Sequence, residues 1–218
     1  MRLIALCLSL WPAIAPAAVP VCETALVLAI DVSNSVDTAE YRLQVGGLAD
    51  ALADPEVIDA LVRDHVALMV FQWSGETQQV VTQAWARMTD TGAVAAFSLN
   101  VRNTPRAIEL SDTAPAEAIR FAAAQFGAVP DCRRRVIDVS GDGTPNAGSD
   151  TRTARGAAQA AGITINAIAI ESLGLAISGF YRQQLITADG FVMTARDHRD
   201  YPRALRDKLI RELARFVG

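Results

Sequence analysis

Nearly uninterrupted apolar runs recur along the chain, separated by segments whose apolar residues follow helical spacing. The runs Ala25–Ile30, Val136–Val139 and Ile163–Ile170 have the length of strands. A strand that is apolar at almost every position is buried on both faces, as in the parallel sheet of an α/β domain. The chain has 218 residues, enough for one such domain with a sizeable core. We therefore expect an α/β fold that is doubly wound, with a mainly parallel central sheet flanked by helices.

Capping residues and turns predict where the helices lie. Asp37, with Glu40 three residues later, predicts a capping box and a helix that Asp54-Pro55 ends. Asp90 is expected to cap one further helix, and Asp150 or Ser149 another. We expect further strands over 65–73, 79–85 and 191–194, helices over 91–99, 116–126, 151–161 and from 202 onward, and a polar loop over 101–114. Residues 22–218 are expected to form one domain.

Three loops of the predicted sheet carry oxygen-bearing side chains. One follows the first apolar run directly, one follows the run at 136–139, and one lies just ahead of the helix at 116–126. Ligands of open α/β sheets bind beyond the carboxyl ends of the strands. Carboxylate and hydroxyl oxygens are the ligands that Mg²⁺ prefers. The sequence therefore predicts a divalent-cation site made of Asp31, Ser33, Ser35, Thr113 and Asp142.

This set resembles the metal site of the von Willebrand factor type A domain. That site combines an Asp-x-Ser-x-Ser loop, a distant threonine and a later aspartate in an Asp-Gly turn. Asp31-Val-Ser-Asn-Ser35 matches the first element and Asp142-Gly143 the last. Thr113 is the best match to the threonine. Asp112 precedes it where such domains commonly have glycine, so Asp112 and Ser111 remain alternative ligands.

Three longer strings are similar to a family of uncharacterised, secreted bacterial proteins that carry this domain. They are Leu-Val-Leu-Ala-Ile-Asp-Val-Ser at 26–33, Arg-Arg-Val-Ile-Asp-Val-Ser-Gly-Asp-Gly at 134–143 and Gly-Ile-Thr-Ile-Asn at 162–166. The resemblance implies a Rossmann-like fold and a metal ion-dependent adhesion site. Such a site holds Mg²⁺, or Mn²⁺ or Ca²⁺, and through the ion binds an acidic group of a protein partner.

The cysteines agree with this strand arrangement. Cys22 lies nine residues before Asp31, and Cys132 lies ten residues before Asp142. If the two aspartates end neighbouring parallel strands, the two cysteines lie together where those strands begin. We expect a disulfide there, although two free buried thiols are the alternative.

The N-terminus is typical of a secretory signal peptide. Arg2 provides the positive charge, Leu3–Trp11 is a short apolar stretch, and Ala15-x-Ala17 favours cleavage after residue 17. We expect residues 1–17 to be removed and the mature chain to be secreted or periplasmic. An uncleaved anchor is the alternative. We expect no membrane-spanning segment in the mature chain.

Other function classes have weaker support. The formal net charge of −4 argues against nucleic-acid binding. Neither His65 nor His198 neighbours a Gly-x-Ser-x-Gly elbow, which is absent, and both are expected to be ordinary surface or boundary residues. A Mg²⁺-dependent phosphohydrolase that uses Asp31 remains one alternative. A structural scaffold with a vestigial metal site is the other.

Overall fold

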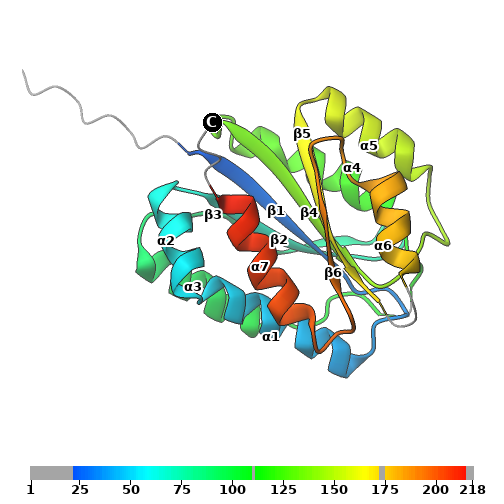
Figure 1. Ribbon diagram of the computed structural model, residues 1–218, viewed down its shortest axis with the longest axis horizontal. Helices are drawn as coiled ribbons and strands as arrows, with labels where there is room; N and C mark the ends of the chain where they lie inside the picture. The colour runs from blue at the N-terminus through cyan, green and yellow to red at the C-terminus, as the bar shows by residue number, and fades with distance from the viewer. Residues whose placement is uncertain (1–21, 110, 172–174, 215–218) are drawn as a thin grey trace, which may run out of the picture.

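A computed structural model describes residues 22–109, 111–171 and 175–214. Within these residues, six strands form one sheet with helices on both faces (Figure 1). The strand order is β3-β2-β1-β4-β5-β6, in which β3 runs antiparallel to β2 and the other neighbours are parallel. The predicted α/β fold with a mainly parallel sheet is confirmed. The predicted signal peptide, residues 1–17, lies outside the described residues.

The elements have the following bounds. The strands are β1 (Thr24–Asp31), β2 (Ala67–Trp73), β3 (Gln79–Arg87), β4 (Arg134–Gly141), β5 (Ile163–Ile170) and β6 (Val192–Ala195). The helices are α1 (Thr38–Leu52), α2 (Pro55–Arg63), α3 (Thr91–Arg102), α4 (Pro115–Gln125), α5 (Thr151–Ala160), α6 (Ala176–Phe180) and α7 (Tyr201–Leu213). A 3-10 turn (Phe126–Ala128) follows α4, and a π-helical turn (Tyr181–Leu185) follows α6.

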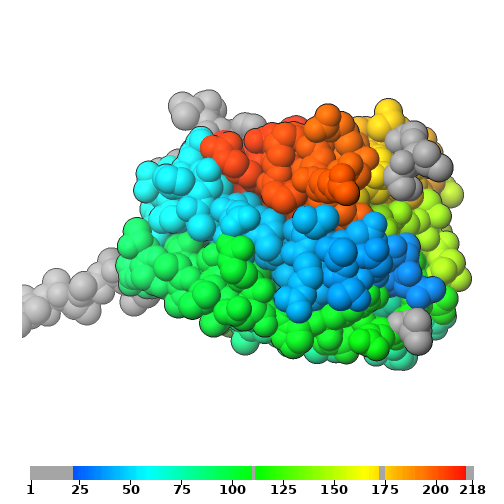
Figure 2. Space-filling view, turned by 90° about the horizontal axis from the view of Figure 1, so that it is seen from below, coloured from blue at the N-terminus to red at the C-terminus, as the bar shows by residue number. Residues whose placement is uncertain are grey.

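Both faces of the central strands are buried because successive side chains point to opposite layers. Leu26 and Leu28 of β1 pack with the layer of α1, α2, α3 and α7, whereas Val27 and Ala29 pack with α4 and α5. Figure 2 shows the first of these layers, in which α1 lies between α3 and α7. This double burial is the physical reason for the apolar runs in the sequence.

The capping box that begins α1 is present. Asp37 Oδ1 accepts a hydrogen bond from the Glu40 backbone N–H at 2.8 Å, and Glu40 Oε2 accepts one from the Asp37 N–H at 2.8 Å. Asp90 and Asp150 cap α3 and α5 as expected. These local hydrogen bonds satisfy N–H groups that the first turn of a helix leaves free.

Three helical segments differ from expectation. Asp54-Pro55 does follow the end of α1, but the same pair begins α2, with Asp54 as its cap and Pro55 in its first turn. A proline near a helix boundary is compatible with either role, because its ring tolerates a first turn. The helix α6 with its π-helical turn was not predicted, and α3 extends to Arg102, into the loop expected over 101–114. Among the described residues, no helix combines the length and apolar character that crossing a bilayer needs.

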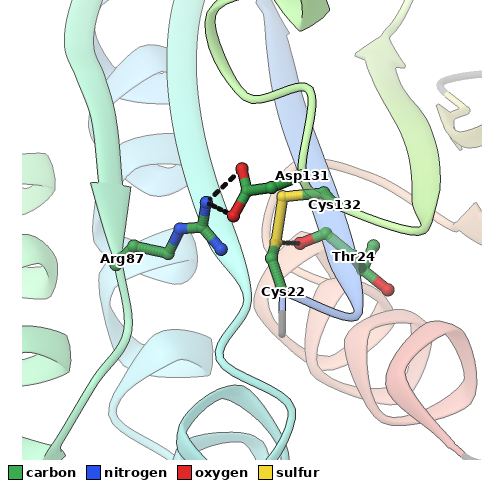
Figure 3. The surroundings of a disulfide bond; sticks show 5 residues. All are labelled: Cys22, Thr24, Arg87, Asp131 and Cys132. Carbon is green, nitrogen blue, oxygen red and sulfur yellow. Dashed lines mark hydrogen bonds and ion pairs between the residues drawn. A yellow bond between two sulfur atoms is a disulfide. The ribbon is translucent and has the colours of Figure 1, made fainter. Parts of the chain in front are cut away.

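A disulfide joins Cys22 to Cys132 at the end of the sheet where β1 and β4 begin (Figure 3). The Arg133 N–H also donates to the Cys22 carbonyl at 3.0 Å, so the two segments are already in register. Beside the disulfide, Arg87 of β3 forms an ion pair with Asp131 at 2.7 Å. The bond closes a sequence separation of 110 residues, far from the opposite ends of both strands.

Replacing both cysteines by alanine is expected to lower the free energy of unfolding by about 2–4 kcal/mol, because the open chain gains conformational entropy when unfolded. Urea denaturation of the double variant Cys22→Ala/Cys132→Ala, beside the oxidised wild type, measures this loss. The wild type with dithiothreitol should match the variant. A loss below about 1 kcal/mol would contradict the expected contribution of this bond.

Candidate metal centre

The polar residues predicted from the sequence meet at the rim of the sheet where β1 and β4 end. The two strands are neighbours, with Ile30 paired to Ser140. From β1 the chain continues to β2 on one side of the sheet, whereas β4 continues to β5 on the other. Strand order therefore reverses between β1 and β4, and such switch points form ligand-binding crevices.

The loop after β1 brings three of the predicted residues together with a fourth. Asp31 Oδ1 accepts a hydrogen bond from the Ser33 backbone N–H at 2.7 Å. The hydroxyls of Ser33 and Ser35 lie 3.1 Å apart. Ser35 Oγ donates to Asp142 Oδ1 at 2.5 Å, across 107 residues of sequence. The carboxylates and hydroxyls therefore form one connected polar cluster.

Thr113 reaches the same cluster from the loop ahead of α4. Its backbone N–H donates to Asn146 Oδ1 at 2.8 Å, which ties this loop to the one after β4. A Cβ placed on Gly143 would lie 3.6 Å from Thr113 Oγ1 and 3.9 Å from Ser35 Oγ. The two hydroxyls therefore flank the same point of the Asp142-Gly143 turn.

The two alternatives to Thr113 have other contacts. The Ser111 hydroxyl donates to Gln78 Oε1. Asp112 is exposed, and its backbone carbonyl accepts from Ser74 Oγ at 2.7 Å. Thr113, in contrast, is only 6% exposed. Of the three residues, Thr113 is the one whose hydroxyl lies beside the Asp142-Gly143 turn.

Arg106 fixes the backbone of the loop after β1. Its guanidinium donates to the carbonyls of Val32 at 2.8 Å, Ser33 at 3.1 Å and Val36 at 2.7 Å, and also to that of Ile108 at 2.9 Å. All four of these hydrogen bonds go to backbone oxygens. The protein itself shapes the loop, and the site keeps its carboxylates available.

The electrostatics of the cluster fit a bound cation. Asp31 is completely buried, and its Oδ2 has no hydrogen-bond partner among the described residues. Burial raises the pKa of Asp31 to about 7, against the opposing effect of the Ser33 hydrogen bond. Burial is also the main cause that raises the pKa of Asp142. A buried carboxylate oxygen without a partner is costly, and a divalent ion with oxygen ligands would satisfy it.

The sequence matches a known family over nearly its whole length. A family model described as "Protein of unknown function (DUF1194)" matches residues 21–217. The chain belongs to this family. A comparison with proteins of curated function found no match.

Solved structures confirm the von Willebrand factor type A fold of this DUF1194 member. A von Willebrand factor type A protein from Catenulispora acidiphila is 19% identical with a TM-score of 0.59, covering 88% of this chain and 42% of that one. Proximal thread matrix protein 1 from the mussel byssus, with a zinc-occupied MIDAS motif, is 15% identical with a TM-score of 0.61, covering 86% and 47%. The pilus adhesin SpaC from Lactobacillus rhamnosus GG, in its open conformation, is 14% identical with a TM-score of 0.64, covering 88% and 30%. This chain therefore spans less than half the length of each.

Tyr181 is a residue of the site that the sequence did not reveal. It comes from the π-helical turn, is completely buried, and its hydroxyl has no hydrogen-bond partner among the described residues. A Cβ on Gly141 would lie 2.5 Å from Tyr181 Oη and 2.8 Å from Asp31 Oδ2. The phenol oxygen and the carboxylate oxygen thus both lie against Gly141, which leaves no room for a side chain at this position.

Gly141→Ala is expected to lower the free energy of unfolding by about 1–3 kcal/mol, because the added methyl group overpacks this contact. It should also weaken Mg²⁺ binding, since Asp31 must shift. Thermal denaturation and calorimetry measure the two effects. Gly156→Ala in α5 is the control: its Cβ would meet nothing within 4 Å, and helix propensity predicts a gain of about 0.5–1 kcal/mol. If Gly141→Ala were as stable as the wild type, Tyr181 and Asp31 would be able to move aside without cost, and the expected overpacking would be contradicted.

Glu40 and His198 also extend the cluster. His198 precedes α7, and its Nδ1 lies 3.1 Å from Glu40 Oε1, while its Nε2 lies 3.9 Å from Asp142 Oδ2. Ligand atoms of Glu40, Asp142 and His198 all lie within 4.8 Å of one another. The expectation that His198 is an ordinary boundary residue is therefore wrong in one respect, because the side chain is buried against two carboxylates. Its place in a loop at the same end of the sheet as Asp142 was the available signal.

Proposed function

We propose that this chain is a protein-binding module whose binding depends on a divalent cation. Asp31, Ser33, Ser35, Thr113 and Asp142 would hold Mg²⁺, Mn²⁺ or Ca²⁺. The observation that carries the proposal is the buried Asp31 Oδ2, which lacks a partner inside a cluster of hydroxyls and carboxylates. An ion at this place would satisfy an oxygen that the protein leaves without a hydrogen bond.

The donor set suits recognition of an acidic group. The three hydroxyl groups are neutral, so among the five proposed protein donors only the carboxylates of Asp31 and Asp142 would offset the charge of a bound ion. When bound, the ion would supply a positive charge and open coordination positions, which a partner's carboxylate could fill. An open hollow of about 420 Å³ adjoins the cluster and gives access to it. It is lined by Asn34, Ser35, Ser111, Asp112, Thr113 and Asn146.

Similar structures support the proposal without establishing it. The mussel byssus protein is described with zinc in its MIDAS motif, and the SpaC protein is described as a pilus adhesin. Both share the fold at low identity. For this chain, the partner protein and its carboxylate remain part of the proposal.

We also propose that the mature chain acts outside the cytoplasm. The disulfide between Cys22 and Cys132 fits an oxidising compartment. The predicted signal peptide, residues 1–17, agrees with export to the periplasm or beyond. Mass spectrometry of the exported chain would test the predicted cleavage after residue 17.

Calorimetric titration of the oxidised protein with Mg²⁺ and Mn²⁺ tests the metal site. We expect saturable binding that is lost in Thr113→Ala and kept in Thr89→Ala. Thr89 is the matched control, because it is exposed and follows Met88, whose N–H bonds to Val66 where β2 begins, at the other end of the sheet. Absence of binding to the wild type would instead support the scaffold alternative.

Water-proton relaxation of the Mn²⁺-loaded protein tests recognition of a carboxylate. A peptide with a central glutamate should displace ion-bound water and lower the relaxation rate, whereas the same peptide with glutamine should not. Equal effects of the two peptides would contradict the proposed recognition. Turnover of p-nitrophenyl phosphate that depends on Mg²⁺ and Asp31 would support the phosphohydrolase alternative.

A further inference from the structure

His198 carries a buried ring nitrogen that has no partner. Its side chain is 9% exposed, and Nε2 has no hydrogen-bond partner among the described residues. The nearest acid facing it is Asp142, whose Oδ2 lies 3.9 Å away. That distance is too long for a hydrogen bond, and a buried polar atom without a partner costs free energy. The ring therefore points at a carboxylate that it does not reach.

The other face of the ring explains its orientation. Nδ1 lies 3.1 Å from Glu40 Oε1, so a proton on Nδ1 faces that carboxylate. The neutral ring then directs the lone pair of Nε2 towards Asp142. Glu40 cannot swing away freely, because its other oxygen, Oε2, accepts the Asp37 N–H in the capping box at 2.8 Å. A carboxylate that orients a histidine in this way is typical of metal sites.

Asp142 presents its two oxygens to different neighbours. Oδ1 accepts from Ser35 at 2.5 Å and so belongs to the cluster after β1. Oδ2 faces His198 instead. Two electron-rich atoms, Nε2 and Oδ2, thus face each other across a gap of 3.9 Å. Ligand atoms around a zinc ion stand about 3.4 Å apart, given bonds of about 2.0–2.2 Å, so a small movement would let both atoms bind one ion.

We propose that His198 and Asp142 form a second cation position, oriented by Glu40, that takes Zn²⁺ or a similar transition metal. Imidazole nitrogen is a preferred ligand of zinc, whereas Mg²⁺ prefers oxygen alone. The second position would therefore differ in metal preference from the oxygen cluster beside it. The inference deepens the proposed function, because the shared Asp142 would couple the two ions.

Zinc titration in the presence of excess Mg²⁺ tests the second position. With the oxygen cluster filled by Mg²⁺, the wild type should still bind about one equivalent of Zn²⁺. His198→Gln should abolish that binding. Glu40→Gln, which can keep the capping box, should weaken it about 10–100-fold. Unchanged zinc affinity in His198→Gln would overturn the inference.

The other histidine provides the control. The chain has two histidines, and His65 lies just before β2, away from the cluster. His65→Asn should leave the zinc affinity unchanged, and asparagine tolerates the positive φ of 46° at this position. If His198→Gln fails to fold, nuclear magnetic resonance of the wild type decides. Zinc should shift the ring signals of His198 and not those of His65, and the reverse pattern would contradict the inference.

Thr113→Ala separates this inference from the proposed function. It should remove Mg²⁺ binding and keep the zinc equivalent that depends on His198. Loss of zinc in Thr113→Ala but not in His198→Gln would place every ion in the oxygen cluster and overturn the second position. Zinc binding that requires His198 in a protein that binds no Mg²⁺ would support the second position and contradict the first. Ring signals of His198 that do not change on adding zinc would also overturn the inference.

Discussion

Asp31→Asn is expected to abolish Mg²⁺ binding and to stabilise the metal-free protein. Both effects follow from the same completely buried carboxylate, whose pKa is raised to about 7 chiefly by burial. Without a metal ion, ionising this group inside the protein costs folding free energy. The neutral amide removes that cost and also removes the ionic ligand. One pKa unit corresponds to about 1.4 kcal/mol, so the gain at pH 8 is at most about 4 kcal/mol.

The stabilisation depends on pH in a defined direction. The pKa of Asp31 is higher in the folded protein than the value of 3.8 expected for an unfolded chain. The folded state therefore holds its proton longer, and metal-free stability falls as the pH rises from about 4 to about 7. The difference between Asp31→Asn and the wild type should be near zero at pH 4 and greatest above pH 7. Asp138, whose pKa burial also raises to about 7, contributes equally to both proteins and cancels.

Urea denaturation in chelator across this pH range, with calorimetry in Mg²⁺, measures both effects. Asp150→Asn is the matched control: its exposed carboxylate caps α5, and the Thr153 hydrogen bond lowers the pKa of Asp150. That variant should bind Mg²⁺ normally and show no gain in stability. If Asp31→Asn were less stable than the wild type at pH 8, the cost of the buried charge would be refuted.

Lys208→Met is expected to lower the free energy of unfolding by about 3–5 kcal/mol, because it leaves two buried carboxylates without a cation. Lys208 Nζ lies 2.5 Å from Asp138 Oδ2 and 2.9 Å from Glu212 Oε2. All three residues are at most 3% exposed. Asn166 of β5 also donates to Glu212 Oε1 at 2.5 Å, so the charges connect α7 to two strands.

Chemical denaturation of Lys208→Met at pH 8 measures this loss. Arg211→Met is the control on the same helix, since Arg211 is exposed and contacts the Phe191 ring. Its loss should stay below about 1 kcal/mol. Neutralising the acids together with the lysine, as Asp138→Asn/Lys208→Met/Glu212→Gln, should recover much of the stability. A single Lys208→Met as stable as the wild type would contradict the role of the lysine.

The parts of the fold that the sequence predicts are those with local causes. Apolar runs predict strands that are buried on both faces, and Asp37 with Glu40 predicts the start of α1. Each of these signals depends on only a few adjacent residues. The burial of Lys208 in α7 has no local cause. It is buried beside Leu205 and Leu209 because Asp138 of β4 pairs with its ammonium group. The sequence alone does not predict that ion pair, because it depends on how α7 packs against the sheet.

The residues of the candidate site also differ in whether a local sequence signal predicts them. Asp31, Ser33 and Ser35 form a local motif, and Asp142 follows a recognisable strand. Tyr181 carried no such signal, because it reaches Gly141 from a π-helical turn that lacks a distinct periodic pattern. Glu40 was interpreted as a cap, which it is, while its second oxygen faces His198 through tertiary packing.

The disulfide also determines how the domain would carry mechanical load. A partner bound at the rim, as proposed, would pull on the ends of β1 and β4, whereas the covalent bond joins the beginnings of the same strands. Tension between the rim and Cys22 would therefore be shared by both strands and would run along them. Parallel strands loaded lengthwise must shear many hydrogen bonds at once, whereas loading across the sheet would open them in turn. The rim is thus connected to the beginnings of β1 and β4 along the stiffest direction of the sheet.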